Sequence, residues 1–303
     1  MSQRPLPYRK AICYSGYRDG QSPESGKIPS STEVEQDLAL LEGEWQSLRL
    51  YASDAHSKTV LDVIRDKALP FDVMLGAYIT AEVDNPNCPW GGEYSPEQLL
   101  ANREHNRDEL RNLIELANHY SSIVSSVSIG NEAAVSWTDH LVPTASLIRY
   151  ARLIKESVSQ PVTFCENYVP WLDKLAPLVD ELDVIAIHTY PVWEYKSIAE
   201  GLAYTIANYQ SVAQAYPDKQ VIITEAGWAT ATNGLGIEPQ HVNQEFQRRY
   251  YKELMEWAER EQVLVYFFEA FDENWKGSDD PLEPEKHWGL YRADRTPKLA
   301  LQA

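Results

Sequence analysis

The chain has 303 residues, of which 44% are hydrophobic and 24% are charged. This length fits one large domain or two small ones, and the hydrophobic fraction is sufficient for a packed core. The 27 basic and 45 acidic residues give a net charge of −18. That charge argues against a nucleic-acid partner, because nucleic acids require a basic face, and against binding to anionic membrane surfaces. An uncharged ligand meets no such repulsion.

The N-terminus and the cysteines indicate where the protein resides. The first ten residues contain no apolar core and so do not form a secretory signal. No segment reaches the roughly 20 apolar residues that a membrane-spanning helix needs. Cys13, Cys88 and Cys165 are odd in number and widely spaced, which is not a disulfide framework. We therefore expect a cytoplasmic protein, or a periplasmic or secreted one if a leader was trimmed, with Cys13 and Cys165 as small core residues.

Eight apolar, β-branched runs recur along the chain and predict eight strands. They cover residues 11–16, 48–52, 71–80, 124–129, 161–165, 182–190, 220–224 and 263–271. The stretches between them have helical spacing, and two open with fitting caps at residues 95–97 and 143–145. The residues that mark this spacing are Leu38, Leu41 and Trp45, then Leu110, Leu113, Ile114 and Ala117, and later Phe246, Tyr250, Leu254 and Trp257.

Strands that alternate with helices imply a parallel sheet, and eight such units favour a closed barrel. We predict that residues 1–303 form a single α/β domain, a (β/α)8 TIM barrel with extended loops after strands one, three and eight. These loops cover residues 17–31, 81–95 and 272–287. The last helix should be brief or missing, because only a short tail follows residue 298. A dinucleotide fold lacks support, since no Gly-x-Gly-x-x-Gly follows the first strand.

Two glutamates stand at the predicted carboxyl ends of strands four and seven. Glu132 ends the segment Ser-Ile-Gly-Asn-Glu, and Glu225 lies in Ile-Thr-Glu-Ala-Gly-Trp. The loops that follow barrel strands form the face that carries active sites. Two carboxyl groups that meet there, one protonated and one ionised, provide the chemistry that cleaves a glycosidic bond. Asn131 is suited to hydrogen-bond a sugar hydroxyl beside the bond that is cleaved.

The residues alone leave other interpretations of this pair open. A buried carboxylate at a strand end can equally be a structural partner of a cation such as Arg49 or Lys276. Chemistry by itself also does not choose between the pair and the other acids at strand ends, which are Glu82, Glu166, Glu269, Asp272 and Glu273.

Other catalytic chemistries find less support. His188 is the only histidine in a predicted strand, and no His-x-His pair exists, so we expect no metal site. The Gly-x-Ser-x-Gly motif of serine nucleophiles is missing. We expect His188 to be a core or supporting group rather than a base. The reaction predicted above requires no organic cofactor.

Seven of the nine tryptophans follow predicted strands, whereas Trp45 and Trp257 sit at helical spacing and should pack in the core. Exposed aromatic faces at the mouth of a barrel suit the C–H-rich faces of sugar rings. Packing of the loops on themselves is the alternative. We expect at least two of the seven to stack on sugar; they are Trp90, Trp137, Trp171, Trp193, Trp228, Trp275 and Trp288.

These motifs give the chain, nearly end to end, a resemblance to glycoside hydrolase family 17, the β-1,3-glucanases and related transglycosylases. The matching segments are Arg-Leu-Tyr (49–51), Gly-Asn-Glu (130–132), Glu-x-Gly-Trp (225–228), Phe-Asp-Glu-Asn-Trp-Lys (271–276) and Trp-Gly-Leu-Tyr (288–291). The resemblance implies that Glu132 is the acid/base and Glu225 the nucleophile, which Tyr190 supports. The substrate-binding residues that we predict are Asn131, Arg49, Tyr51, Tyr190, Trp193, Trp228, Glu273, Trp275 and Lys276.

The resemblance further implies a retaining hydrolase that cleaves β-1,3-glucan (laminarin) or its oligosaccharides through a glucosyl-enzyme. Residues 13–23 are closest to bacterial members, and the long loops would wall off one end of the groove, which favours exo action. One alternative is a transglycosylase with the same catalytic pair, which an acceptor groove of Trp137, Trp171 and Trp193 would favour. A second alternative is a barrel that acts on β-1,4-linked glucans or mannans. A third is a non-catalytic glucan-binding protein, which the presence of both glutamates argues against. The oligomeric state is not indicated.

Overall fold

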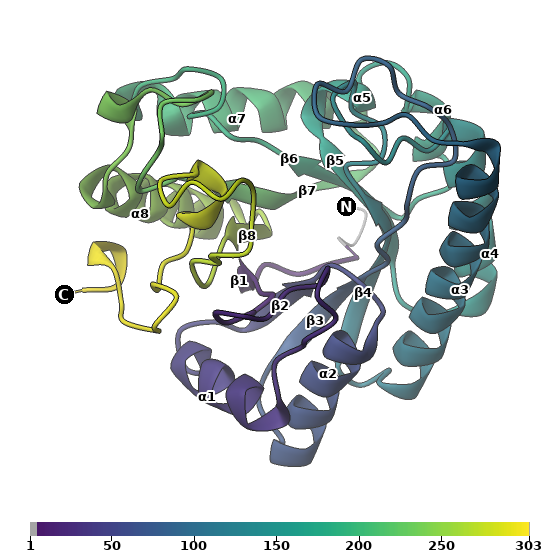
Figure 1. The fold of residues 1–303 in the computed structure, drawn as a ribbon, viewed down its shortest axis with the longest axis horizontal. Helices are drawn as coiled ribbons and strands as arrows, with labels where there is room; N and C mark the ends of the chain where they lie inside the picture. Colours follow the sequence, from purple (N-terminus) through teal and green to yellow (C-terminus); the bar gives the residue numbers. More distant parts are fainter. Residues whose placement is uncertain (1–4, 303) are drawn as a thin grey trace.

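Eight parallel strands close into a barrel in the computed structural model, which describes residues 5–302 (Figure 1). Strands pair in sequence order, and the last pairs with the first. The first four residues of the N-terminal stretch considered above lie outside the described range. The strands are β1 (Lys10–Cys13), β2 (Ser47–Leu50), β3 (Asp72–Gly76), β4 (Val124–Asn131), β5 (Val162–Asn167), β6 (Val184–His188), β7 (Gln220–Gly227) and β8 (Val265–Phe268).

Helices surround the strands and cover the outside of the barrel (Figure 1). None of the helices in residues 5–302 is long and apolar enough to span a membrane. They are α1 (Ser31–Leu41), α2 (Ala55–Lys67), α3 (Pro96–His119), α4 (Thr144–Ser157), α5 (Tyr168–Trp171), α6 (Ala176–Val179), α7 (Ile198–Ala215) and α8 (Gln244–Glu261), with 3-10 turns η1 (Pro239–His241), η2 (Pro284–Lys286) and η3 (Leu299–Leu301).

The eight predicted strand ranges each overlap an observed strand, and the closed parallel barrel is confirmed. The predicted cap at Ser95 is also found, since its side chain accepts the backbone N–H of Gln98. The expectation of a brief or missing last helix holds, because only 3-10 turns follow β8 in the described chain. The placement of Trp45 in a helix was wrong. Helix α1 ends at Leu41, and Trp45 is buried in the turn before β2.

Long segments connect several strands to the helices that follow them. Residues 14–30 link β1 to α1 and residues 77–95 link β3 to α3, while the chain after β8 runs on without an α-helix. Residues 228–243, between β7 and α8, form a comparable connection that was not predicted. The prediction that residues 1–303 are one catalytic domain stays a prediction.

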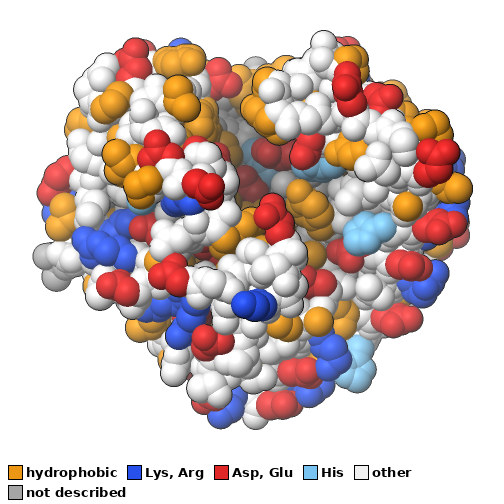
Figure 2. Space-filling view, in the orientation of Figure 1, with side chains coloured by type: hydrophobic (Ala, Val, Ile, Leu, Met, Phe, Trp, Pro, Cys, Tyr) orange, Lys and Arg blue, Asp and Glu red, His pale blue; other side chains and the backbone are white. Residues whose placement is uncertain are grey.

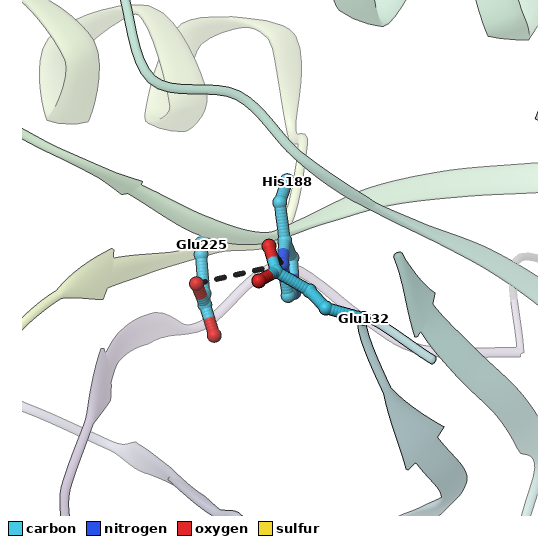
Figure 3. Close-up of side chains that lie close together, drawn as sticks. All are labelled: Glu132, His188 and Glu225. Carbon is cyan, nitrogen blue, oxygen red and sulfur yellow. Dashed lines mark hydrogen bonds and ion pairs between the residues drawn. The ribbon is translucent and has the colours of Figure 1, made fainter. Parts of the chain in front are cut away.

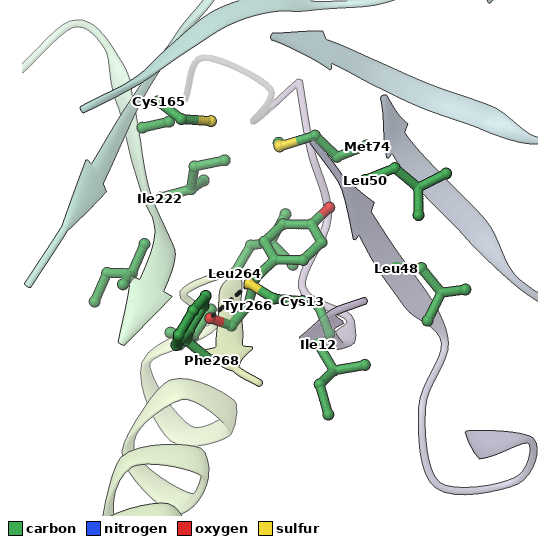
Figure 4. Packing of buried hydrophobic residues seen from close by; sticks show 14 of the residues in the cluster. Ile12, Cys13, Leu48, Leu50, Met74, Cys165, Ile222, Leu264, Tyr266 and Phe268 are labelled. Carbon is green, nitrogen blue, oxygen red and sulfur yellow. Dashed lines mark hydrogen bonds between the residues drawn. The ribbon is translucent and has the colours of Figure 1, made fainter. Parts of the chain in front are cut away.

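Apolar side chains from most strands pack together in a continuous core (Figure 4). Ile12, Leu48 and Ile222 are fully buried in it. Cys13 and Cys165 are buried free thiols, as expected for small core residues. The alternation of apolar strands with amphipathic helices therefore supplies a packed frame for the strand ends.

The strand pairing is irregular close to that mouth. The register between β6 and β7 shifts between Ile187 and His188, which places His188 opposite Glu225. A second register shift lies between Ser128 and Asn131, where β4 pairs with β5. Such irregularities re-aim side chains next to active sites. Here they alter the direction of the strand ends that carry Glu132, His188 and Glu225.

A buried ion-pair cluster fastens the loop after β1 to the C-terminal segment. Asp37 on α1 is completely buried, and it accepts hydrogen bonds from Arg18 at 2.9 Å and from Arg295 at 2.7 Å and 2.9 Å. Arg295 also donates to the carbonyl oxygen of Gly16 at 2.9 Å. One carboxylate thus joins three segments that are far apart in the sequence.

We expect Asp37→Ala to lower the free energy of unfolding by about 3–5 kcal/mol, because it leaves two arginines without their buried partner. Urea denaturation monitored by fluorescence measures this change. The matched control on the same helix is Glu35→Ala, whose pair with Lys67 is half exposed and should be worth less than about 1 kcal/mol. Equal losses in the two variants would show that Asp37 is no anchor.

Candidate active site

Glu225 lies near the carboxyl end of β7 and is buried. Its Oε1 atom accepts hydrogen bonds from Arg49 at 2.5 Å and from the Tyr51 hydroxyl at 3.0 Å, and its Oε2 atom accepts one from the Tyr190 hydroxyl at 2.5 Å. Burial alone would raise the pKa of Glu225, but the charges of His188 and Arg49 and the bond from Tyr190 outweigh burial and lower the pKa to about 2. Glu225 is therefore an ionised carboxylate at neutral pH.

Glu132 follows β4 directly and reaches into the same space. Its backbone φ of 44° lies in the left-handed region, which a residue other than glycine seldom adopts. The backbone N–H of Glu132 donates to the carbonyl oxygen of Cys165 at 2.9 Å, which holds this turn against β5. The Glu132 side chain is 30% exposed. It is thus the more accessible of the two carboxyl groups to solvent.

His188 lies close to both glutamates and is fully buried (Figure 3). Its Nδ1 atom is 2.8 Å from Oε1 of Glu132 and 3.4 Å from Oε2 of Glu225. Burial lowers the pKa of His188, but the charge of Glu225, the contact with Cys165 and the bond to Glu132 outweigh burial and raise the pKa to about 10. The ring is therefore an imidazolium at neutral pH, and its Nδ1–H points at both carboxyl groups.

One atom of each of these three residues lies within 4.8 Å of the other two, which is close enough for a shared metal ion. The histidine atom in this set is the protonated one, however, and a bound ion would have to displace its proton. The charge balance of the site instead uses two protein cations, His188 and Arg49, beside Glu225.

Asn131 is fixed by contacts on both sides. Its Oδ1 atom accepts a hydrogen bond from Arg49 at 2.5 Å, so the amide N–H groups remain available to a ligand. The backbone carbonyl oxygen of Asn131 lies 3.0 Å from Nε2 of His140, and the other ring nitrogen of His140 lies 2.7 Å from Asp139. The segment that precedes Glu132 is therefore held from the barrel interior and from the loop after β4.

A second charged cluster comes from the chain after β8. Lys276 donates to Glu269 at 2.6 Å and 2.7 Å and contacts Glu273 at 2.9 Å. Although burial opposes its charge, these two carboxylates raise the pKa of Lys276 above its ordinary value. Glu273 also accepts bonds from the Ser15 hydroxyl at 2.6 Å and the Tyr17 backbone N–H at 2.9 Å, which ties the loop after β1 to the chain after β8.

This cluster adjoins the glutamate pair through aromatic rings. The ammonium group of Lys276 lies 4.8 Å from the centre of the Phe268 ring, and the Tyr190 ring contacts Phe268 edge-on at 5.7 Å. Trp275 lies edge-on to Tyr17 with ring centres 5.8 Å apart. Figure 2 shows a cleft on this face of the molecule, with acidic and histidine side chains inside it. The structure thus brings together the predicted residues from strands two, four, six, seven and eight.

The tryptophans divide into buried and accessible sets, and this division corrects part of the sequence interpretation. Trp228 is fully buried, and its indole N–H donates to the carbonyl oxygen of His241 at 2.9 Å. A ring without exposed area presents no face to a sugar, so Trp228 packs the core. The same correction applies to Trp171, which was assigned to an acceptor groove, and to Trp288. Trp90 and Trp137 are exposed, at 67% and 40%.

Three acidic groups near the pair were not assigned a role from the sequence. Glu166 on β5 is buried and accepts the backbone N–H groups of Ala134 and Asn167, each at 2.7 Å. Its burial, with the nearby charge of Glu132, raises the pKa of Glu166 to about 8. Glu269 holds Lys276, as described above. Burial raises the pKa of Glu285 to about 7; the charge of Lys276 opposes this effect, and those of Glu132 and Glu225 add to it.

Comparisons with known proteins are consistent with this geometry. Residues 11–289 match the BtgE/BtgC glycoside hydrolase domain. The chain belongs to this family. A glucan 1,3-beta-glucosidase of Arthroderma benhamiae is 21% identical over 94% of this chain and 89% of its own length.

Solved structures share the fold of this BtgE/BtgC-type domain. The crystal structure of an endo-laminarinase from Formosa has a TM-score of 0.81 and 24% identity, and covers 96% of this chain and 85% of that one. The crystal structure of a glycoside hydrolase family 17 β-1,3-glucanosyltransferase from Rhizomucor miehei has a TM-score of 0.75 and 21% identity. The match covers 97% of this chain and 96% of that one. The expected relationship to glycoside hydrolase family 17 is thus supported.

The role of Arg49 in this glycoside hydrolase domain can be tested without substrate. We expect the Glu225 carboxyl in Arg49→Leu to titrate about one to three pH units higher than in the wild type, because the nearest guanidinium no longer favours the ionised form. Carbon-13 NMR of labelled glutamate measures both midpoints. Arg49→Lys, which keeps the charge but loses the planar fork, should give an intermediate value. An unchanged midpoint in Arg49→Leu would remove Arg49 from the set that controls Glu225.

Proposed function

We propose that the protein is a retaining glycoside hydrolase that cleaves β-1,3-linked glucan or its oligosaccharides through a covalent glucosyl-enzyme. The observation that carries this proposal is the spacing of Glu132 and Glu225, whose nearest carboxyl oxygens lie within 4.8 Å. Retaining enzymes place their carboxyl groups about 5–5.5 Å apart, whereas inverting enzymes leave about 6.5–9.5 Å for a water molecule. The short spacing favours direct attack by one carboxylate.

The environments of the two glutamates support different roles. Glu225 is ionised and held by Arg49, Tyr51 and Tyr190, as a nucleophile requires. Glu132 is partly exposed and can reach a glycosidic oxygen. In the first step Glu225 forms a bond to the anomeric carbon while Glu132 gives a proton to the departing oxygen. In the second step Glu132 takes a proton from water, whose oxygen bonds to the anomeric carbon on the face that the departing group left, while the bond from that carbon to Glu225 on the opposite face breaks.

The substrate class rests on the relatives and on the charge of the chain. The named relatives act on β-1,3-glucans, and an active-site mutant of the Rhizomucor miehei enzyme was crystallised with laminaritriose. A neutral glucan is compatible with a net charge of −18. Asn131, whose Oδ1 atom is taken by Arg49, would donate through its amide N–H groups to the 2-hydroxyl of the reacting sugar. Lys276 with Glu273 and Trp275 would hold hydroxyls and a ring face farther along the cleft.

Exo action is supported by loops that are fastened at the rim. In the segment after β3, the Asn85 side chain donates to the carbonyl oxygens of Ser136 and Thr138 at 2.9 Å and 2.7 Å. The Tyr94 hydroxyl donates to the carbonyl oxygen of Asp139 at 2.8 Å. These bonds hold residues 77–95 beside the loop that follows Glu132. A rim fixed in this way would close one end of the groove and leave chain ends as the substrate.

Transfer to a second sugar is the alternative reaction of the same catalytic pair. It is favoured by the full-length similarity of the fold to a β-1,3-glucanosyltransferase. It also draws support from Trp137, which is 40% exposed in the loop after Glu132, where an acceptor sugar would enter. In that reaction a sugar hydroxyl takes the place of water in the second step.

We expect Glu225→Ala to abolish the cleavage of laminari-oligosaccharides, because no carboxylate remains to attack the anomeric carbon. Azide should partly restore cleavage of an activated aryl glycoside and give an α-configured glycosyl azide, which proton NMR identifies. Tyr51→Phe keeps the nucleophile and serves as the control that azide does not rescue. Full activity of Glu225→Ala would contradict the assignment of Glu225 as the nucleophile.

The mode of action is expected to be visible in the products of laminaripentaose at millimolar concentration. The products are measured by chromatography over time. Exo hydrolysis predicts that glucose or another fixed unit, released from one end of the chain, accumulates. Products longer than the starting sugar would assign the enzyme to the transferases. Random internal products at early times would contradict a groove closed at one end.

A further inference from the structure

The donors to the two catalytic glutamates are unequally distributed. Glu225 accepts hydrogen bonds from Arg49, Tyr51 and Tyr190 and lies 3.4 Å from the His188 ring nitrogen. Within residues 5–302, the side-chain hydrogen bond found for the Glu132 carboxyl is the one from His188, at 2.8 Å. A change at His188 therefore leaves Glu225 with three other donors and Glu132 with no protein donor of this kind.

The hydrogen position on His188 follows from its partners. An ionised carboxylate only accepts hydrogen bonds, so the Nδ1 atom that faces both glutamates carries a hydrogen. The ring is fully buried and cannot exchange this contact for water. The charged and titratable groups that face it are Glu225 on β7, Glu132 after β4, and Cys165 and Glu166 on β5. Figure 3 shows the three side chains close together, with the His188 ring beside the Glu132 carboxyl and a contact to Glu225.

We propose that His188 is a positioning residue that stabilises the Glu132 carboxylate left behind when Glu132 protonates the departing oxygen. The proposal rests on the proposed function and adds a residue to its first step. It does not make His188 an acid or a base toward the substrate.

The two halves of the reaction move negative charge between the glutamates. At the start the charge is on Glu225. As its oxygen bonds to the anomeric carbon, the bond from that carbon to the glycosidic oxygen breaks and the proton of Glu132 passes to that oxygen. Glu225 is then a neutral ester, and the charge is on Glu132. Because His188 stays cationic and lies within 3.4 Å of both, its full attraction becomes available to Glu132 at the moment the proton leaves.

This role predicts a dependence on the leaving group. A sugar leaving group needs the proton of Glu132, whereas a 2,4-dinitrophenolate leaves without one. We expect His188→Asn to lower kcat/KM for laminaritriose about 100-fold, as the loss of efficient general-acid catalysis does. The kcat/KM for 2,4-dinitrophenyl β-laminaribioside should fall less than about fivefold, since Glu225 keeps its other donors.

Tyr190→Phe is the matched control, because the Tyr190 hydroxyl contacts Glu225 and not Glu132. It should lower kcat/KM for both substrates by the same factor. The ratio of the two rates is measured on one enzyme sample, so it does not depend on the folded fraction of a variant. His188→Gln provides a second variant with a longer side chain. We expect it, like His188→Asn, to raise the ratio of kcat/KM for the dinitrophenyl substrate to kcat/KM for laminaritriose.

The pH profile supplies a readout that a packing role would not move. Removing a buried cation makes the neighbouring carboxyl groups harder to ionise, so both limbs of kcat/KM against pH should shift to higher pH in His188→Asn. In the wild type, nitrogen-15 NMR should show a doubly protonated His188 ring at neutral pH both before and after a 2-fluoro sugar is trapped on Glu225. This measurement needs no variant.

An equal loss on both substrates with an unmoved pH profile would overturn the proposal and leave His188 with a packing role. A neutral His188 ring in the trapped enzyme would overturn it as well. Neither result would affect the proposed function, which the wild-type rates test separately. A folded wild-type protein that cleaves neither substrate would overturn the proposed function and this inference together.

Discussion

The buried pair of Arg49 and Glu225 is the interaction on which the mouth of the barrel depends. Arg49 is almost completely buried on β2, and its guanidinium contacts Glu225 on β7 and Asn131 at the end of β4. One planar group with several donors thus sets the relative position of three strand ends, which a lysine with its single ammonium group would not do. A buried pair of this kind contributes little net stability, and its value here lies in the fixed position and charge of Glu225.

The remaining charges at the mouth follow from that first pair. An ionised Glu225 attracts a second cation, and His188 supplies it. His188 in turn donates a hydrogen bond to Glu132 at 2.8 Å. The chain after β8 repeats the arrangement with Lys276 between Glu269 and Glu273. Three buried or half-buried cations, Arg49, His188 and Lys276, thus lie against carboxyl groups at the mouth.

The sequence was most informative where a residue's position along a strand decides its role. Apolar runs located all eight strands, because strands buried on both faces have few polar residues, and a carboxylate directly after such a run must lie at the carboxyl-terminal mouth. Burial in the loops could not be predicted in the same way. Trp228 and Trp171 follow strands as Trp137 does, but both are buried, Trp228 against Tyr250 of α8 and Trp171 against Phe164 of β5. A local sequence pattern does not tell which of these rings are covered.

The contact of His188 with both glutamates could not be predicted from the sequence either. It depends on the register shift between Ile187 and His188, which brings His188 level with Glu225 rather than with the residue before it. Nothing in the run Val-Ile-Ala-Ile-His signals such a shift, because the irregularity arises from how β6 and β7 pair. The same geometry explains why the two glutamates are not interchangeable. Glu225 is surrounded by donors that favour its ionised form, whereas Glu132 has, within residues 5–302, one side-chain donor and partial exposure, which would suit the proton-transfer role proposed for it.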